Sequence, residues 1–470
     1  MKGMARKLRC FWTVLLIMVL CGSVFAETGD EKDAKKVLSS VEDARYFVEV
    51  LLGDDASSLD GAYQMTKMMD TAMLLSGGFG GLARQLGSLG ELQEICPGYE
   101  TVVQGRKAFR VPCRFSVQSI DFLFVMDGDS VAGLTLQEFT GTEPAEQKPE
   151  ENGAQEPADA DSAFDSVELA LPVPEMEEEL PGTLTLPKGD GPFPAVVMVH
   201  GSGPGDRDET TGSLTPFKDI AEGLAKKGIA VYRFDKRTFA LGSQMAADTS
   251  VTLKEESIND AAAAVQLLAR QDKIDPDRIF AAGHSLGAAA IPAVDQALKT
   301  EPVQACGYIL LAPPARRLDV VMREQYEFLS ALSPEIAAQK DAMFAELDHL
   351  AELDSLPEDF MIAGAYVPYW KWLADYDILE EARKITLPCL LLQGEEDYQA
   401  TMEDFSLFQE AVGDRENWTL VSFPGLVHAF IHGEKAEGAA VYQKDERVDP
   451  VVIADMADFI NSTSDAAEKK

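Results

Sequence analysis

Short apolar runs recur from residue 166 onward and alternate with stretches whose apolar residues repeat every three or four positions. Continuous apolar runs are typical of strands buried on both faces, and intervening helices indicate parallel neighbours. The sequence therefore predicts an α/β fold, a mostly parallel sheet flanked by helices. The predicted strands are Val167–Leu171, Thr183–Leu186, Ala195–Val199, Ile229–Phe234, Arg278–Ala282, Gly307–Leu311, Cys389–Leu392 and Trp418–Phe423, with helices near 215–227 and 254–271.

Residues 313–386 interrupt this alternation with a helical, acidic insertion that ends in aromatic residues. An insertion before the strand Cys389–Leu392 would lie above the carboxyl ends of the strands, where such sheets bind ligands. We expect it to form a cap, with Tyr369, Trp370 and Trp372 as candidate residues of a substrate pocket.

A segment rich in Pro, Ala and Glu at 143–165 predicts a linker, because its few apolar residues cannot bury a core. It separates a predicted small domain, 27–142, from the large domain, 166–470. The small domain has helical periodicity at Val37–Leu51 and about 58–75, followed by strand-like runs, which predicts an α+β domain. Those runs are Thr101–Val103, Phe109–Val117, Ile120–Met126 and Val131–Leu136, the last two joined by a turn signal, Asp127–Asp129.

The chain carries 41 basic and 79 acidic residues, a formal net charge of −38. Nucleic acids and anionic membrane surfaces repel such a polyanion, so the charge argues against both as partners. Hydrophobic residues make up 46% of the chain, which is enough for ordinary globular domains and argues against disorder of the whole chain.

Residues 1–26 have the pattern of a secretory signal peptide: a basic head, an apolar run at Phe11–Leu20 and a small-x-small end at Val24–Ala26. We therefore expect export to the periplasm or the medium, with no stable membrane insertion after cleavage. An uncleaved anchor and a lipoprotein at Cys21 are the alternatives, the second disfavoured because Leu20 is not small.

Cleavage would leave Cys96, Cys113, Cys306 and Cys389. None has the spacing of a metal site, and no motif indicates an organic cofactor, so we expect neither. In an oxidising compartment Cys96 and Cys113 could form a disulfide, a question that the sequence leaves open.

The central motif is Gly283-His284-Ser285-Leu286-Gly287, which follows a predicted strand and opens a predicted helix. In that context G-x-S-x-G indicates a nucleophile elbow, a strained turn that exposes the serine hydroxyl at the end of a helix. Ser285 is therefore the candidate nucleophile.

A serine hydroxyl needs a base, and the base needs an orienting acid, in the chain order Ser, acid, His. Of the five histidines, His428 follows the last predicted strand by a short turn, whereas His432 looks like a solvated loop residue. Asp397 follows the preceding strand and is preferred to Glu395 and Glu396 as the acid.

The glycine-rich stretch after Ala195–Val199 completes the candidate site. A tetrahedral oxyanion needs two preorganised donors. We expect these to be the backbone N–H groups of Leu286, just after the nucleophile, and of Ser202 in the loop His200–Asp208. The stretch is not a phosphate loop, because it lacks the G-K-[ST] ending.

The motifs HGSGPGDRDE, RFDKRTFALG at 233–242, GHSLG, QGEEDYQ and PGLVHAF occur in this order across nearly the whole large domain. With them the chain resembles the α/β-hydrolases, and more narrowly bacterial secreted serine esterases close to the dienelactone-hydrolase and acyl-thioesterase branch. The small domain loosely resembles an uncharacterised domain found ahead of secreted hydrolases.

The resemblance implies hydrolysis of carboxylic esters through a Ser285–Asp397–His428 triad and an acyl-enzyme. The expected partner is a small-molecule or acylated-polymer ester. A peptidase, thioesterase or acyltransferase on the same triad is the alternative. The sequence does not determine the natural substrate, the acyl length, the role of the small domain or the oligomeric state.

Overall fold

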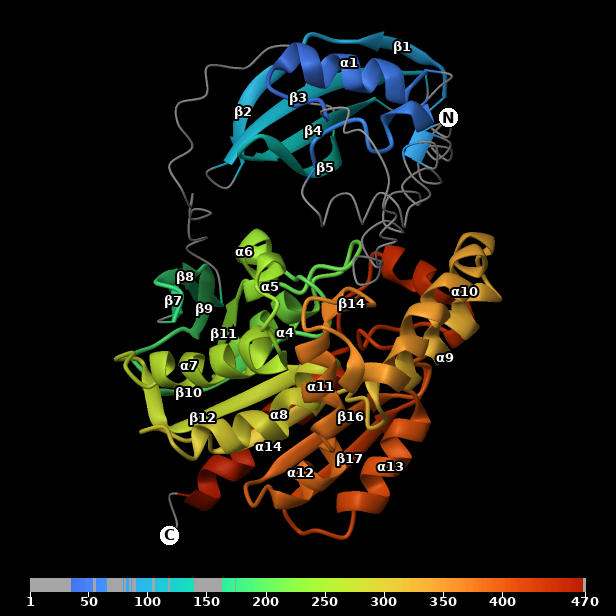
Figure 1. Ribbon diagram of the computed structural model, residues 1–470. Helices are drawn as coiled ribbons and strands as arrows, with labels where there is room; N and C mark the ends of the chain where they lie inside the picture. The colour runs from blue at the N-terminus through green and yellow to red at the C-terminus, as the bar shows by residue number, and fades with distance from the viewer. Residues whose placement is uncertain are drawn as a thin grey trace. The chain divides into compact units, whose positions relative to one another are not determined.

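The computed structural model describes residues 35–53, 56–65, 79, 82–83, 86, 90–103, 106–116, 119–138, 163–173 and 175–467 of the chain (Figure 1). The chain divides into two compact units that meet in sequence between Pro157 and Ala158. The predicted signal peptide, 1–26, and most of the predicted linker lie outside the described residues.

In the small unit the helix α1 (Val41–Leu51) packs against an antiparallel five-stranded sheet of order β1-β3-β4-β5, with β2 also paired to β3. Ser40 caps the helix through the backbone N–H of Asp43, and Phe47 on its buried face contacts the rings of Tyr63 and Phe124 edge-on. The elements are α1 (Val41–Leu51), η1 (Ala56–Leu59), β1 (Leu92–Ile95), β2 (Tyr99–Val103), β3 (Arg106–Phe115), β4 (Ile120–Asp127) and β5 (Ser130–Glu138).

One prediction for this unit needs correction, and one question that the sequence left open is answered. The helix predicted at about 58–75 is wrong at its start: η1 ends at Leu59, and a turn with Gly61 at a φ of +71° leads to Met65, which bridges Val131 of β5. Its remainder, 66–75, lies outside the described residues. Cys96 and Cys113 are buried and free, so they do not form the disulfide that the sequence left open.

An eight-stranded sheet of order β17-β16-β13-β12-β10-β11-β9-β6 forms the centre of the large unit. Its strands from β17 to β11 pair in parallel, and β9 and β6 are antiparallel at one edge. The strands are β6 (Phe164–Glu168), β9 (Gly182–Pro187), β10 (Phe193–Val199), β11 (Ala230–Phe234), β12 (Ile274–His284), β13 (Gly307–Leu311), β16 (Cys389–Gly394) and β17 (Trp418–Phe423). A separate hairpin joins β7 (Leu171–Val173) to β8 (Glu178–Leu180).

Helices cover both faces of this sheet (Figure 1). Val196 packs with residues of α4 and α14 on one face, whereas its neighbour Val197 packs with residues of α7, α8, α12 and α13 on the other. This two-sided burial is why the parallel strands are continuous apolar runs. The helices are α4 (Pro216–Ala225), α5 (Arg237–Ala240), α6 (Gly242–Ala247), η3 (Lys254–Ile258), α7 (Asn259–Leu268), α8 (Leu286–Leu298), α12 (Ile378–Lys384), α13 (Met402–Val412), η5 (Lys435–Gln443) and α14 (Pro450–Ala467).

The insertion between β13 and β16 is mainly helical, as predicted. It contains α9 (Leu318–Ser330), α10 (Pro334–Asp348), η4 (His349–Ser355), β14 (Met361–Ile362), β15 (Ala365–Tyr366) and α11 (Val367–Asp375) before α12. Among the described residues, no helix is long and apolar enough to cross a membrane.

Candidate active site

Ser285 stands on a sharp turn between β12 and α8, with φ of 52° and ψ of −121°, a backbone conformation that L-residues rarely adopt. The turn needs its two glycines. A Cβ on Gly283 would lie 2.3 Å from the carbonyl oxygen of Gly287, and one on Gly287 would lie 2.3 Å from that of His200. The motif therefore folds as the predicted elbow, at the N-terminal end of α8, where the first N–H groups have no intrahelical acceptor.

His428 and Asp397 are in direct contact, with 2.6 Å between His428 Nδ1 and Asp397 Oδ2. The carboxylate is buried and its position is fixed by three further donors. Gln399 N and Ala400 N donate to Oδ1 at 2.6 and 3.2 Å, and Gln393 Nε2 donates to Oδ2 at 3.2 Å. Such a partner holds the proton of the imidazole on Nδ1 and leaves Nε2 as the acceptor.

Hydrogen bonds connect the loop of His428 to the elbow and to the acid loop. His284, the residue before Ser285, lies with Nε2 3.0 Å from the carbonyl oxygen of His428, and the two imidazole rings are 4.6 Å apart. Glu396 N donates to the carbonyl of Leu426 at 2.9 Å. The structure thus gathers the predicted nucleophile, base and acid at the carboxyl ends of β12, β17 and β16.

The loop that begins at His200 lies against the elbow, since a Cβ on Gly201 would be 3.2 Å from the Cβ of Ser285. Gly201 N donates to Glu209 Oε1 at 2.8 Å and is therefore occupied. The next N–H, that of Ser202, is the candidate oxyanion donor, together with Leu286 N at the start of α8. Lys236 fixes the loop by donating to the carbonyls of Gly201 and Gly203 at 2.7 and 3.0 Å.

Three buried ionisable groups beside the triad have shifted pKa values. Burial lowers the pKa of His200, so its ring is neutral. Burial opposes charge on His284 as well, but the Glu209 carboxylate, 2.9 Å from Nδ1, outweighs it and raises the pKa of His284. The pKa of Glu209 is lowered for the reciprocal reason, because His284 outweighs the effect of burial. His284 and Glu209 therefore form a buried ion pair.

The charged residues of the loops around the site form ion pairs. Arg207 contacts Asp235, Arg233 contacts Asp208, Lys236 contacts Glu256, and Arg237 contacts Asp260. With these partners, the conspicuous charges of HGSGPGDRDE and RFDKRTFALG hold the loops around the site together.

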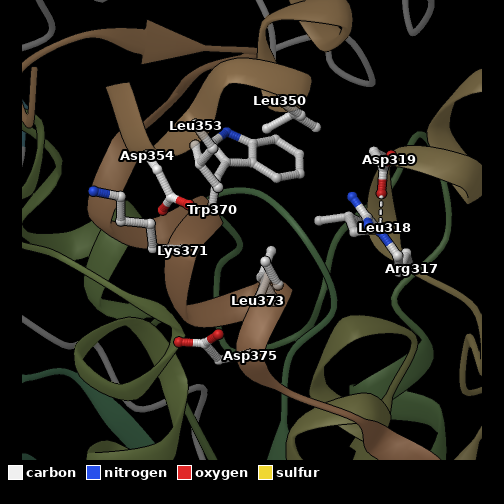
Figure 2. Close-up of a pocket in the computed structure, with 11 residues that line it drawn as sticks. Arg317, Leu318, Asp319, Leu350, Leu353, Asp354, Trp370, Lys371, Leu373 and Asp375 are labelled. Atoms are coloured by element: carbon white, nitrogen blue, oxygen red, sulfur yellow. Dashed lines mark hydrogen bonds and ion pairs between the residues drawn. The ribbon is translucent and has the colours of Figure 1, made fainter. Parts of the chain in front are cut away.

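The cap aromatics have different surroundings. The Tyr369 hydroxyl hydrogen-bonds Glu256 and is buried, and Trp372 stacks on Tyr376. Only Trp370 of the three candidates lines a pocket of about 310 Å³ within the insertion (Figure 2). The other lining residues are Arg317, Leu318, Asp319, Leu350, Leu353, Asp354, Lys371, Leu373, Ala374 and Asp375.

Comparison with known proteins identifies the family of the chain. A family model described as serine aminopeptidase, S33 matches residues 192–436, which is just over half of the 470-residue chain. The chain belongs to this α/β-hydrolase family. The predicted fold class is confirmed, and so is the prediction of a hydrolase.

A curated relative is 34% identical over 422 residues, 88% of this chain and 94% of its own length: the esterase EstD of Thermotoga maritima. Similar solved structures include an esterase of Pyrococcus furiosus, 18% identical over 64% of this chain and 92% of that one, with a TM-score of 0.40. Another is Est1E of Butyrivibrio proteoclasticus, 18% identical over 63% of this chain and 98% of that one, also with a TM-score of 0.40.

Sequence reasoning missed the residues that support the triad. Gln393 lies inside a strand and donates to Asp397, and Glu209 closes the glycine-rich loop. His284 is the variable position of G-x-S-x-G, so the motif gave no reason to single it out. A polar residue inside an apolar strand was the available signal for Gln393.

Within the described ranges no group of three or more His, Cys, Asp and Glu side chains is placed to hold a metal ion.

Proposed function

We propose that the protein is a serine carboxylesterase that works through an acyl-enzyme. The observation that carries the proposal is the 2.6 Å contact between His428 and Asp397, joined through the His284 bond to the elbow that presents Ser285. A serine beside an imidazole with a fixed tautomer is the arrangement that activates a hydroxyl as a nucleophile.

In the first half-reaction, Ser285 Oγ attacks the acyl carbon while His428 Nε2 takes the hydroxyl proton. Asp397 accepts a hydrogen bond from Nδ1–H and stabilises the imidazolium that forms. The N–H groups of Ser202 and Leu286 donate to the oxyanion. The intermediate then expels the alkoxide, which receives its proton from His428.

In the second half-reaction, a water molecule attacks the acyl carbon of the Ser285 ester as His428 removes its proton. Collapse of this intermediate returns the proton to Ser285 Oγ and releases the carboxylic acid. Water is therefore the acceptor, and neither half-reaction requires a metal or an organic cofactor.

A peptidase is the second candidate, because the family model is described as an aminopeptidase. Asp354 and Asp375 in the cap pocket could receive a substrate amine, although Asp319 there pairs with Arg317 and Lys371 also lines the pocket. The named relative, an esterase that matches over 88% of the chain, favours the ester instead. Assays of an aryl ester, an aminoacyl anilide and an ester with added acceptor alcohol separate hydrolysis of esters, hydrolysis of amides and acyl transfer. Faster turnover of the anilide would overturn the esterase proposal.

We further propose that the substrate is a small-molecule or acylated-polymer ester, that the protein is exported through residues 1–26, and that nucleic acids are not partners. The basic-then-apolar N-terminal pattern and the net charge of −38 support these points. We also propose a place near the dienelactone-hydrolase and acyl-thioesterase branch, but as an esterase and not as a lactone-specific enzyme, because Ser285 stands where the dienelactone hydrolases have Cys. Fractionation of cells that express the full chain tests export. We expect the cleaved protein in the periplasmic fraction or in the medium.

A further inference from the structure

Glu209 and His284 form a second acid–histidine pair directly behind the triad, and the proposed reaction assigns neither a role. Both side chains are almost buried, with 13% and 11% of their surface exposed. Glu209 has a φ of +54°, so the loop adopts a conformation that is unfavourable for its residue in order to present this carboxylate. The pair contacts the candidate oxyanion loop on one side and the loop of His428 on the other.

The contacts of His284 define its protonation state. Its Nδ1 lies 2.9 Å from Glu209 Oε2, and its Nε2 lies 3.0 Å from the carbonyl oxygen of His428. The carbonyl oxygen takes a proton on Nε2, and the Glu209 carboxylate beside Nδ1 favours a second proton there, so the geometry favours an imidazolium. The second oxygen of Glu209, Oε1, accepts from Gly201 N at 2.8 Å.

We propose that Glu209 and His284 act as a charged positioning pair that holds the oxyanion loop and the catalytic imidazole in register across Ser285. The proposal rests on the proposed esterase function. Glu209 accepts from Gly201 N–H and so fixes the His200–Gly201 peptide unit, which precedes the unit that carries Ser202 N–H. His284 fixes the backbone of His428 through the carbonyl oxygen of His428. Oxyanion donors and the base must be held to within about 0.5 Å of the productive geometry, and one ion pair here constrains both.

The pair also places a positive charge near the base. The ring of His284 lies 4.6 Å from the ring of His428, centroid to centroid. Two carboxylates from neighbouring elements act on His284, those of Glu209 and Asp397. The Tyr442 hydroxyl is buried beside both carboxylates, and burial with these charges raises its pKa, so it stays neutral.

Two substitutions of Glu209 separate the effect of its hydrogen bonds to Gly201 and His284 from the effect of its charge. In Glu209→Gln, the amide oxygen can still accept from Gly201 N–H, and the amide NH₂ can donate to Nδ1 of a neutral His284 that keeps its bond to His428. Glu209→Ala removes both contacts. Asp219→Asn is the matched control, because Asp219 is also a buried carboxylate that contacts a cation, Arg447 at 2.6 Å, and a backbone N–H, Val448 at 3.2 Å, away from the triad.

The experiment measures kcat and KM with an aryl acetate, for the wild type, Ser285→Ala and these three variants, each checked for folding by circular dichroism. We expect Glu209→Ala to lower kcat by roughly 10- to 100-fold, below the 10²–10³ for removal of an oxyanion donor, with KM changed less than about threefold. Glu209→Gln should recover kcat to within about threefold. Asp219→Asn should change neither kcat nor KM.

A folded Glu209→Ala with wild-type kcat would overturn the positioning role. So would a Glu209→Gln whose kcat is as low as that of Glu209→Ala. Failure of the esterase proposal would look different: the wild type would then turn over the ester no faster than Ser285→Ala. The positioning role would fall with it.

Discussion

Asp397→Asn changes one atom of the buried carboxylate and tests the whole hydrogen-bond arrangement of the base. The carboxylate accepts two hydrogen bonds on each oxygen, from Gln399 and Ala400 on Oδ1 and from His428 and Gln393 on Oδ2. An asparagine has only one acceptor oxygen, so two of the four donors must face its NH₂ group.

The less costly orientation of the asparagine predicts inactivation. If the NH₂ group faced the backbone donors Gln399 N and Ala400 N, neither could adapt, at a cost of about 1–3 kcal/mol each. If it faces His428, the imidazole can adapt by moving its proton to Nε2, and only Gln393 loses its acceptor. That tautomer cannot receive the proton of Ser285. We therefore expect unfolding free energy to fall by about 1–3 kcal/mol and kcat by about 10³–10⁴, equivalent to roughly 4–5.5 kcal/mol of barrier.

The assay is steady-state hydrolysis of an aryl acetate at pH 7.5, with denaturant unfolding to measure stability. Glu396→Gln is the control, since the Glu396 side chain accepts a hydrogen bond from Lys435 N at 3.0 Å that its amide oxygen can keep, and its kcat should stay within about twofold. Retention of more than a tenth of wild-type kcat by Asp397→Asn, or a larger loss in Glu396→Gln, would refute this reasoning.

Three further predictions follow from the elbow, the two-unit chain and the buried ion pair. Ser285→Gly and Ser285→Ala should both lose activity by about 10⁴–10⁶. The glycine variant should nevertheless be more stable than the alanine variant by about 1 kcal/mol in denaturant unfolding, because φ is 52° at this position. Equal stabilities of the two variants would contradict the backbone strain. A truncated chain that begins at Ala163 should fold and hydrolyse small soluble esters at the wild-type kcat, since every candidate site residue lies in the large unit; an inactive but soluble product would contradict this. Because the pKa of His284 is raised in the folded protein, its contribution to stability is complete below about pH 6.5 and is lost as pH rises through the folded-state pKa. The unfolding free energy should therefore decline on the alkaline side in the wild type and not in Glu209→Gln. Parallel pH curves of the two proteins would argue against the ion pair.

The order of strands and helices in the large unit was predictable because parallel strands are buried on both faces. Trp418–Phe423 and Gly307–Leu311 are strands with the predicted bounds. The elbow was predictable for a different reason: its glycines are required by backbone contacts as short as 2.3 Å, which no other residue could satisfy.

The rest depends on contacts between distant segments. The helix predicted across 60–65 was wrong because Met65 pairs with a strand more than sixty residues away, and local periodicity does not contain such a partner. The strand β6 begins at Phe164, inside the predicted linker, because Phe164 pairs with Pro187. Likewise, Glu209 and His284 become a pair only when the loop after β10 meets the carboxyl end of β12.

The central claim is that Ser285 is the nucleophile of an acyl-enzyme, and its most direct test is covalent capture. Trypsin would release residues 279–299 as one peptide, in which Ser285 is the only hydroxyl-bearing side chain. After reaction of the full chain with a fluorophosphonate, we predict complete loss of esterase activity and one phosphonyl adduct, located by mass spectrometry on this peptide and absent from Ser285→Ala. An adduct on another peptide, or esterase activity that persists with Ser285 fully labelled, would contradict the account.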